Sequence, residues 1–213
     1  MDGCMGSVDH DRERGKLARM ARRLNAGAPS CPVGGLILMT DDGIDADWAE
    51  SAAALPRGSA VIVRHRNAQA RERLVRLLIG CCRARGVRVL VADDAGLALR
   101  ARADGVHLPE RKVMLAAGVR RRRRDWIIST SVHGEASVAR ALRLPVDVLL
   151  ASPFMPTRSH PGAAALGAVR LASLVPGRSM PVYALGGIDA ANAGRLAPTR
   201  VRGIAVIRGW CGA

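Results

Sequence analysis

The residues best suited to chemistry begin with a pair of glycines late in the chain, Gly186 and Gly187. They directly follow a short apolar run at residues 182–185, and a second apolar run covers residues 203–207. Glycines at the point where a strand turns toward a helix let backbone N–H groups approach an anion closely. In a barrel of eight strand–helix units, the loops after strands seven and eight commonly hold a phosphate. The two runs therefore predict a phosphate site if six further units precede them.

Other reactive side chains follow other apolar runs, at positions where strands would end. They are Arg64, Arg66, Asp93, His107, His133, Thr157, Ser159 and His160. Taken singly, each of these residues could have a purely structural role, as a surface arginine, a helix cap or a buried histidine. The carboxyl ends of parallel barrel strands meet on one rim, where such barrels carry their active sites. Their shared placement therefore predicts a functional site on that rim.

Eight apolar runs alternate with helical patterns over most of the chain. The expected strands cover residues 36–40, 60–63, 87–91, 105–108, 126–131, 146–151, 182–185 and 203–207. The expected helices cover residues 46–55, 69–85, 97–102, 135–142, 168–174 and 190–196. Short apolar runs between amphipathic helices are typical of buried parallel strands. We therefore expect an α/β fold, a single closed (β/α)8 TIM barrel, with an open doubly wound sheet as second choice.

The first 34 residues are expected to form a basic extension ahead of a barrel domain at residues 35–213. Residues 9–24 place Leu17, Met20, Ala21 and Leu24 on one face among charged residues, which predicts an amphipathic helix. The proline- and glycine-rich stretch that follows is expected to be a linker. The helix either covers the barrel floor, which we prefer, or offers a surface to a partner.

Composition indicates a globular protein, because 49% of the 213 residues are hydrophobic. No apolar run approaches the roughly 18 residues of a membrane span, and the first residues lack the apolar segment of a secretory signal. The five cysteines have no metal-ligand spacing, which favours reduced thiols. We expect a cytoplasmic protein without a membrane partner.

The formal net charge of +15 raises the hypothesis of nucleic-acid binding. Aromatic residues make up only 2% of the chain, however, which leaves almost nothing for bases to stack on. Lys16 and Lys112 are the only lysines among 33 basic residues, so the arginine excess suggests a compositional bias. The densest basic run, residues 120–124, is expected to be a solvated turn between elements. Nucleic-acid binding is therefore kept as a distant alternative.

Several motifs in the same order match those of a known family. They are Ala-Asp-Gly-Val-His-Leu at 103–108, Ser-Thr-Ser-Val-His at 129–133, Ser-Pro-Phe-Met-Pro-Thr at 152–157 with Pro-Gly at 161–162, and Ala-Leu-Gly-Gly-Ile at 184–188 with 203–207. From about residue 36 to 210 the chain thus resembles the thiamine-phosphate synthase/TenI superfamily. The resemblance implies a role in thiamine biosynthesis. A synthase of this family joins a pyrimidine pyrophosphate to a thiazole phosphate, and magnesium and basic residues help the pyrophosphate depart.

The resemblance also implies roles for individual residues. The expected catalytic residues are Arg64, Arg66 and His133, and the expected magnesium ligand is Asp93. The expected phosphate-binding residues are Thr157, Ser159, His160, Gly186, Gly187, Ile207 and Arg208. The small-molecule partners implied are a thiazole phosphate and a pyrimidine pyrophosphate.

The chain departs from the synthase pattern at several of these positions. The family's Gln-x-Arg-x-Lys motif reads Ile-Val-Arg-His-Arg at residues 62–66, so Arg66 replaces a lysine and the amide is lost. Lys112 stands where the family has its second magnesium carboxylate, which leaves Asp93 as the remaining one. Magnesium can be held through one or two carboxylates plus phosphate oxygens, so Mg2+ is kept as an expected cofactor. A lysine there either supplies positive charge itself or points to solvent. Arg208 replaces a small hydroxyl residue.

Three functions follow from the resemblance. The first choice is a transferase of the thiamine-phosphate synthase type. The second is a TenI-like thiazole tautomerase, in which His133 would move a proton, since imidazole is a suitable acid–base group near neutral pH. The third is a barrel that binds a phosphate ligand without catalysis. A histidine in this motif is found in synthases too, so His133 does not separate the first two.

Overall fold

The computed structural model describes residues 3–26, 31–157, 164–175, 177 and 180–212. Eight parallel strands close into a barrel in sequence order, and β8 pairs with β1. The strands are β1 (Leu36–Met39), β2 (Ala60–Val63), β3 (Arg88–Ala92), β4 (Gly105–Leu108), β5 (Ile127–Val132), β6 (Val148–Ala151), β7 (Val182–Leu185) and β8 (Gly203–Val206). The expected (β/α)8 TIM barrel is therefore confirmed.

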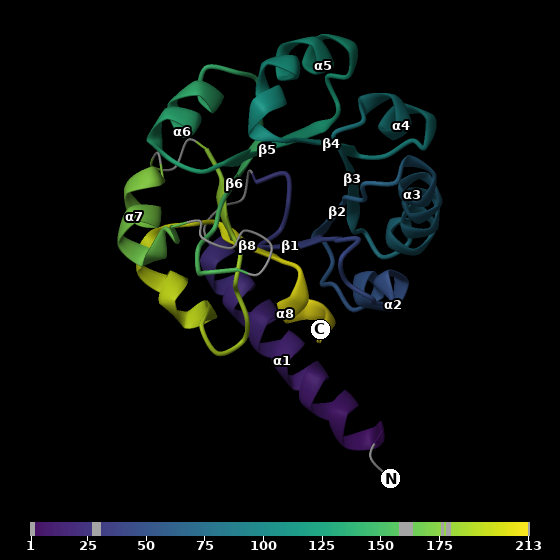
Figure 1. Ribbon diagram of the computed structural model, residues 1–213, viewed down its shortest axis with the longest axis vertical. Coiled ribbons are helices and arrows are strands. Elements are labelled where there is room, and N and C mark those ends of the chain that lie inside the picture. The colour runs from purple at the N-terminus through teal and green to yellow at the C-terminus, as the bar shows by residue number, and fades with distance from the viewer. Residues whose placement is uncertain (1–2, 27–30, 158–163, 176, 178–179, 213) are drawn as a thin grey trace.

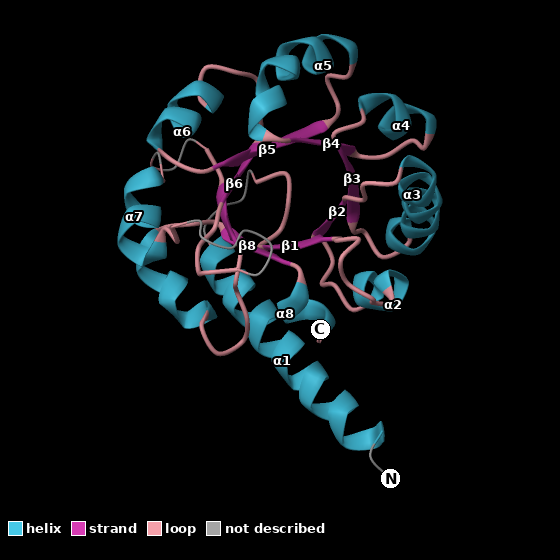
Figure 2. Cartoon of the chain, in the orientation of Figure 1, coloured by secondary structure: helices cyan, strands magenta, loops and turns pink. Residues whose placement is uncertain are grey.

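Helices surround the ring of strands, as Figure 2 shows. They are α1 (Gly3–Asn25), α2 (Trp48–Ala53), α3 (Ala68–Arg83), α4 (Ala95–Arg100), η1 (Glu110–Leu115), α5 (Ala116–Arg122), α6 (Glu135–Ala141), α7 (Gly167–Leu174), η2 (Ala193–Thr199) and α8 (Arg208–Cys211). None of the described helices is long and apolar enough to cross a membrane.

Alternation along each strand produces two apolar layers. In β1, Ile37 and Met39 face the interior of the barrel, whereas Leu36 and Leu38 belong to the layer beneath the helices. This is the period of two expected for a strand whose two faces are both buried. Tyr183 points inward from β7, and its hydroxyl donates to the carbonyl oxygen of Val33 at 2.6 Å, near the amino end of β1.

The helix of the extension, α1, packs against the outside of the barrel where β8 meets β1 (Figure 1). Leu17 and Ala21 are buried in the outer apolar layer. Arg14 fixes the helix further: its Nε donates to the carbonyl oxygen of Trp210 at 2.9 Å, and its two terminal nitrogens donate to the Glu50 carboxylate at 2.6 and 2.9 Å. The helix therefore covers the wall, and our expectation that it covers the floor is wrong.

The stretch from 110 to 122 is helical, although we expected no helix there. Val113 in η1 and Ala116 in α5 are buried, so these helices pack on the barrel. Arg120, expected in a solvated turn, lies in α5 and is only partly exposed. It donates to the Trp126 carbonyl oxygen at 2.8 Å and to the Asp147 carboxylate at 2.5 Å. This part of the basic run is therefore structural.

Candidate functional site

A cavity of about 520 Å³ opens at the carboxyl ends of the strands. Its lining comes from α1, from the carboxyl ends of β1, β7 and β8, and from the segments that follow β2, β6, β7 and β8. The lining residues are Glu13, Met39, Arg64, Ser152, Pro153, Pro156, Thr157, Leu185, Gly186, Gly187, Ile188, Asp189, Ala205, Val206, Ile207, Arg208, Gly209 and Gly212. Six of the residues expected from the sequence therefore share one cavity: Arg64, Thr157, Gly186, Gly187, Ile207 and Arg208.

The glycine pair forms a turn that only glycine fits. Gly186 and Gly187 have φ values of 99° and 66°, in the region that side chains rarely adopt. A Cβ on Gly187 would lie 2.8 Å from Met155 Cβ and 2.9 Å from the Pro156 carbonyl oxygen. The loop after β6 thus packs directly on this turn, and the Met155 amide donates to the Gly186 carbonyl oxygen at 3.0 Å.

The amides of this turn remain available for a ligand. No acceptor in the described part of the chain takes a hydrogen bond from Gly186 N or Gly187 N. The carbonyl of Gly187, in contrast, accepts from Asn192 Nδ2 at 2.8 Å, which fixes the orientation of the peptide. Backbone N–H groups that border a cavity and lack an acceptor suit a phosphate oxygen.

Arg64 brings a cation to the same cavity from the end of β2. Its Nη2 donates to Asp41 Oδ2 at 2.5 Å, and Asp41 is almost fully buried. The Arg64 backbone is fixed by Thr40, whose Oγ1 accepts from the Arg64 amide at 2.9 Å. The guanidinium has five N–H donors, so a partner on one nitrogen leaves others for a ligand. Sequence reasoning missed Asp41, although its position after the first strand was a usable signal.

His133 lies beside the cavity rather than in its lining. His133 is an exposed residue, and its Nδ1 lies 2.8 Å from the carbonyl oxygen of Ser152, which does line the cavity. A carbonyl oxygen can only accept, so in the neutral ring Nδ1 carries the proton and Nε2 keeps its lone pair. The His133 amide donates to Ser137 Oγ at 2.9 Å, at the start of α6.

Two further residues expected in the site, Arg66 and Asp93, do not line this cavity. The Arg66 side chain is 86% exposed and pairs with Asp42 at 3.1 Å. Asp93 lies after β3 and pairs with two cations: Lys112 Nζ is 2.7 Å from Oδ1, and Arg111 Nη2 is 3.0 Å from Oδ2. The expected phosphate ligands Ser159 and His160 fall outside the described residues.

His107 points into the barrel from β4 and is not part of the exposed rim. Nδ1 lies 3.0 Å from Ser129 Oγ and Nε2 lies 3.1 Å from Ser131 Oγ. Burial and, to a smaller extent, the Arg64 charge lower the pKa of His107 from 6.5 to about 4, against an opposing effect of Asp93. The ring is therefore neutral at physiological pH and forms part of the layer beneath the site.

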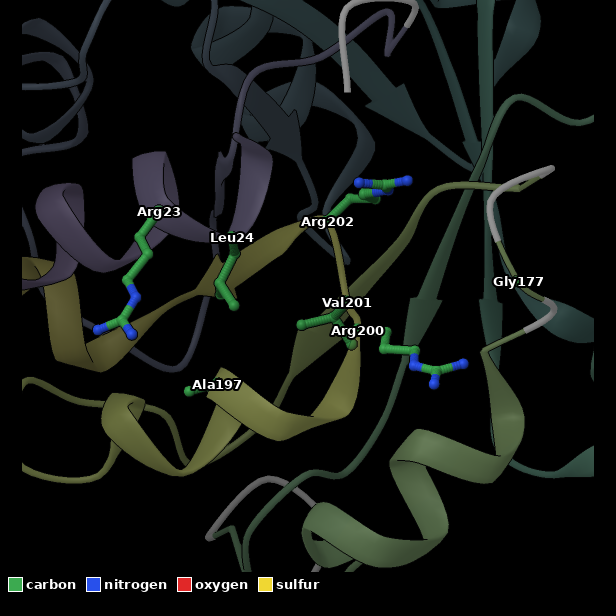
Figure 3. A pocket seen from close by; sticks show the side chains of 7 residues that line it. All are labelled: Arg23, Leu24, Gly177, Ala197, Arg200, Val201 and Arg202. Carbon is green, nitrogen blue, oxygen red and sulfur yellow. The ribbon is translucent and has the colours of Figure 1, made fainter. Parts of the chain in front are cut away.

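A second cavity of about 560 Å³ lies at the other end of the barrel, near the end of α1 and the start of β8. Arg23, Arg200 and Arg202 line it together with small and apolar residues. Figure 3 shows the Arg23 side chain pointing to the opposite side from those of Arg200 and Arg202. The three cations do not converge on one point, so the carboxyl-end cavity is the better candidate.

Glu13 is a lining residue that sequence reasoning missed. It lies on α1, one position before the buried Arg14, so the contacts of Arg14 hold this part of the helix at the rim. A glutamate on an amphipathic helix carries no signal of such a position, because solvent exposure accounts for it equally well.

Comparison with known proteins identifies the family. A family model described as thiamine monophosphate synthase matches residues 36–210. The chain belongs to this family, one of thiamine biosynthesis. A thiamine-phosphate synthase from Chromobacterium violaceum is 37% identical over 183 residues, which cover 83% of this chain and 88% of the relative. One from Mycobacterium bovis is 30% identical over 205 residues, or 94% of this chain and 83% of that protein.

Solved structures give the same family and fold. A thiamine phosphate pyrophosphorylase from Pyrococcus furiosus has a TM-score of 0.73 at 29% identity, covering 84% of this chain and 88% of that one. A KDPGal structure at 13% identity has a TM-score of 0.56, which shows the barrel fold alone. The resemblance to the thiamine-phosphate synthase/TenI superfamily is therefore confirmed.

The surroundings of Asp93, the expected magnesium ligand, do not suit magnesium. In the described ranges, no three His, Cys, Asp or Glu side chains group closely enough to hold a metal ion. Asp93 faces two positive side chains within 3.0 Å. A divalent cation at Asp93 would have to displace both, because it would be repelled by each at close range.

Proposed function

We propose that this protein is a transferase of the thiamine-phosphate synthase type, which joins a thiazole phosphate to a pyrimidine pyrophosphate. The observation that carries the proposal is the cavity at the carboxyl ends of the strands. There the Gly186–Gly187 turn presents two amides without a described acceptor, and Arg64 and Arg208 line the same space. Membership of the family over residues 36–210 supports this choice of substrates.

The phosphate of the thiazole binds at the glycine turn. Its oxygens accept from Gly186 N and Gly187 N, and the Thr157 hydroxyl and the Arg208 side chain border the same cavity. Apolar side chains of the lining, among them Met39, enclose the ring. Backbone donors fixed in place need no reorganisation when the ligand arrives, which favours a defined orientation of the thiazole nitrogen.

The reaction is a substitution at one carbon, the methylene carbon of the pyrimidine. The C–O bond between the pyrimidine methylene and pyrophosphate breaks, and the oxygen keeps both electrons. The lone pair of the thiazole nitrogen forms the new C–N bond at that carbon. Negative charge grows on the leaving oxygen, so fixed cations nearby stabilise the transition state more than the ground state. Arg64, fixed by Asp41, supplies such a cation at the cavity wall.

The second candidate is a thiazole tautomerase, favoured by the geometry of His133. Its Nδ1 bond to the Ser152 carbonyl oxygen leaves Nε2 as a proton acceptor next to the cavity. A base placed in this way abstracts a proton from one position of the thiazole and returns it at another. That reaction releases no pyrophosphate, so it makes no demand on Arg64 as a leaving-group cation.

Turnover assays separate the two reactions. The protein is incubated with thiazole phosphate, with and without the pyrimidine pyrophosphate, and thiamine phosphate, pyrophosphate and the thiazole isomer are followed by mass spectrometry. For a synthase, Arg64→Gln should lower kcat by about 10²–10³, as expected for one lost donor to a transition-state charge. The matched control is Arg121→Gln, which removes one exposed positive charge from α5 and should leave the rate unchanged.

Two other outcomes of these assays would refute the synthase. An isomer formed without the pyrimidine pyrophosphate, and a loss of about 10²–10⁴ in that rate with His133→Asn, would establish the tautomerase instead. Calorimetric binding of thiazole phosphate without any turnover would refute both enzymatic functions and leave a phosphate-binding barrel.

A further inference from the structure

A cluster of one carboxylate and two cations follows β3 and β4 on the rim that carries the cavity. Asp93 comes directly after β3, and its amide donates to the His107 carbonyl oxygen at 2.9 Å, which ties it to β4. Arg111 and Lys112 follow β4 in η1 and reach back to Asp93, at 3.0 and 2.7 Å. The cluster carries one negative and two positive charges, so its net charge is +1.

Both oxygens of Asp93 are committed to these cations. Oδ2 accepts a hydrogen bond from Arg111 Nη2. Oδ1 has almost no surface exposed to solvent and accepts no hydrogen bond of ordinary geometry from a described residue, so Lys112 holds it through charge alone. Mg2+ binds through oxygen ligands at about 2.0–2.1 Å, in octahedral geometry. At Asp93 such an ion would meet Lys112 at the buried Oδ1 and Arg111 at Oδ2.

The two cations, in contrast, keep donors for an anion. The Arg111 side chain is 69% exposed and the Lys112 side chain 42% exposed. A guanidinium has five N–H donors and an ammonium has three. Arg111 uses one of its donors on Asp93 Oδ2, and Lys112 pairs with Oδ1 by charge. Planar guanidinium pairs and ammonium point charges are both common ligands of phosphate oxygens.

We propose that Arg111 and Lys112, held in place by Asp93, bind the pyrophosphate group of the substrate in the role that magnesium has in the family, so that this protein binds pyrophosphate without a divalent metal. The inference rests on the proposed function for the identity of the substrate. Arg64 lies after β2, between this cluster on β3 and β4 and the glycine turn on β7. The leaving group therefore departs toward a net positive charge that belongs to the protein itself.

The test measures binding of inorganic pyrophosphate by calorimetry, in EDTA and in excess Mg2+. The wild-type protein should bind in EDTA with an affinity close to that in Mg2+. Arg111→Gln and Lys112→Gln should each weaken binding in EDTA by about 10- to 100-fold, the usual effect of losing one charge-assisted hydrogen bond. Arg121→Gln, with the same change in net charge, should bind like the wild type. Thermal unfolding checks that each variant is folded.

A second variant reverses the metal requirement. Lys112→Asp places a carboxylate beside Asp93, so binding should be lost in EDTA and recovered in Mg2+. Wild-type binding that requires Mg2+, or an unchanged affinity in both Lys112→Gln and Arg111→Gln, would overturn the inference. The readout needs no turnover, so it is independent of the proposed function: a protein without synthase activity can still bind pyrophosphate here, and a metal-dependent synthase would refute this inference alone.

Discussion

Lowering the pH should destabilise the protein through one buried side chain, His107. The ring lies inside the barrel at β4, about 5% exposed, between Ser129 Oγ at 3.0 Å and Ser131 Oγ at 3.1 Å. Each serine hydroxyl can donate or accept, so the neutral ring is fully satisfied. A charged ring would lose its hydration on burial and would face the Arg64 cation, and these two effects lower its pKa to about 4.

The size of the effect follows from the difference between the folded and unfolded pKa values. A shift from 6.5 to about 4 corresponds to about 3 kcal/mol of unfolding free energy. Because the folded pKa is the lower one, the unfolded chain binds the proton first as the pH falls. The contribution is therefore fully present above pH 6.5, declines between about pH 6.5 and 4, and declines no further below that.

Urea unfolding at several pH values between 7.5 and 4, followed by circular dichroism, measures this loss. Carboxylates titrate in the same range, so the comparison is with His107→Gln, whose amide can still bond with both serines but does not ionise there. The wild type should lose about 3 kcal/mol more than the variant over this interval. Parallel pH dependences of the two proteins would refute the assignment of a buried neutral histidine.

Two further substitutions test the cavity and the extension. Gly187→Ala should abolish thiazole-phosphate binding in calorimetry. It should also lower the unfolding free energy by more than the roughly 1–2 kcal/mol that a left-handed alanine costs, because the new Cβ would lie 2.8 Å from Met155 Cβ. Unchanged binding in a folded variant would contradict a phosphate site at this turn. Arg14→Lys keeps the charge, but a lysine cannot bond with both Glu50 oxygens and the Trp210 carbonyl oxygen at once. The variant should lose about 2 kcal/mol of unfolding free energy and show faster hydrogen exchange in α1. Exchange rates equal to those of the wild type would refute the anchoring role of Arg14.

The sequence predicted the barrel because its strands are buried on both faces. Runs such as residues 60–63 and 203–207 are apolar at every position, and such runs, when helices separate them, are typical of a parallel sheet covered on both sides. Strand order then brings six expected site residues to one cavity, since it places the carboxyl ends of the strands together. The sequence shows which residues follow each strand, and the closed parallel barrel places all of those residues on one rim.

The errors came from contacts between distant residues. Arg120 looked like part of a solvated run, but its partner Asp147 lies 27 positions away and was invisible to local pattern. The helix α1 was expected on the floor; it occupies the wall beside β8 and β1, where α8 extends only from Arg208 to Cys211. Which side of a barrel an amphipathic helix covers depends on which side lacks cover, and that is a property of the whole fold.

The two ends of the candidate site differ in the kind of group that recognises an anion, and for this reason one was easier to predict than the other. At β7 the donors are backbone amides, fixed by glycines with positive φ, and glycine at such a turn is readable from sequence. At β3 and β4 the donors are the side chains of Arg111 and Lys112, whose direction depends on Asp93. Family membership and the glycine turn therefore support the phosphate site that we propose at β7, whereas the pyrophosphate site that we propose at β3 and β4 has to be argued from this chain's own charges.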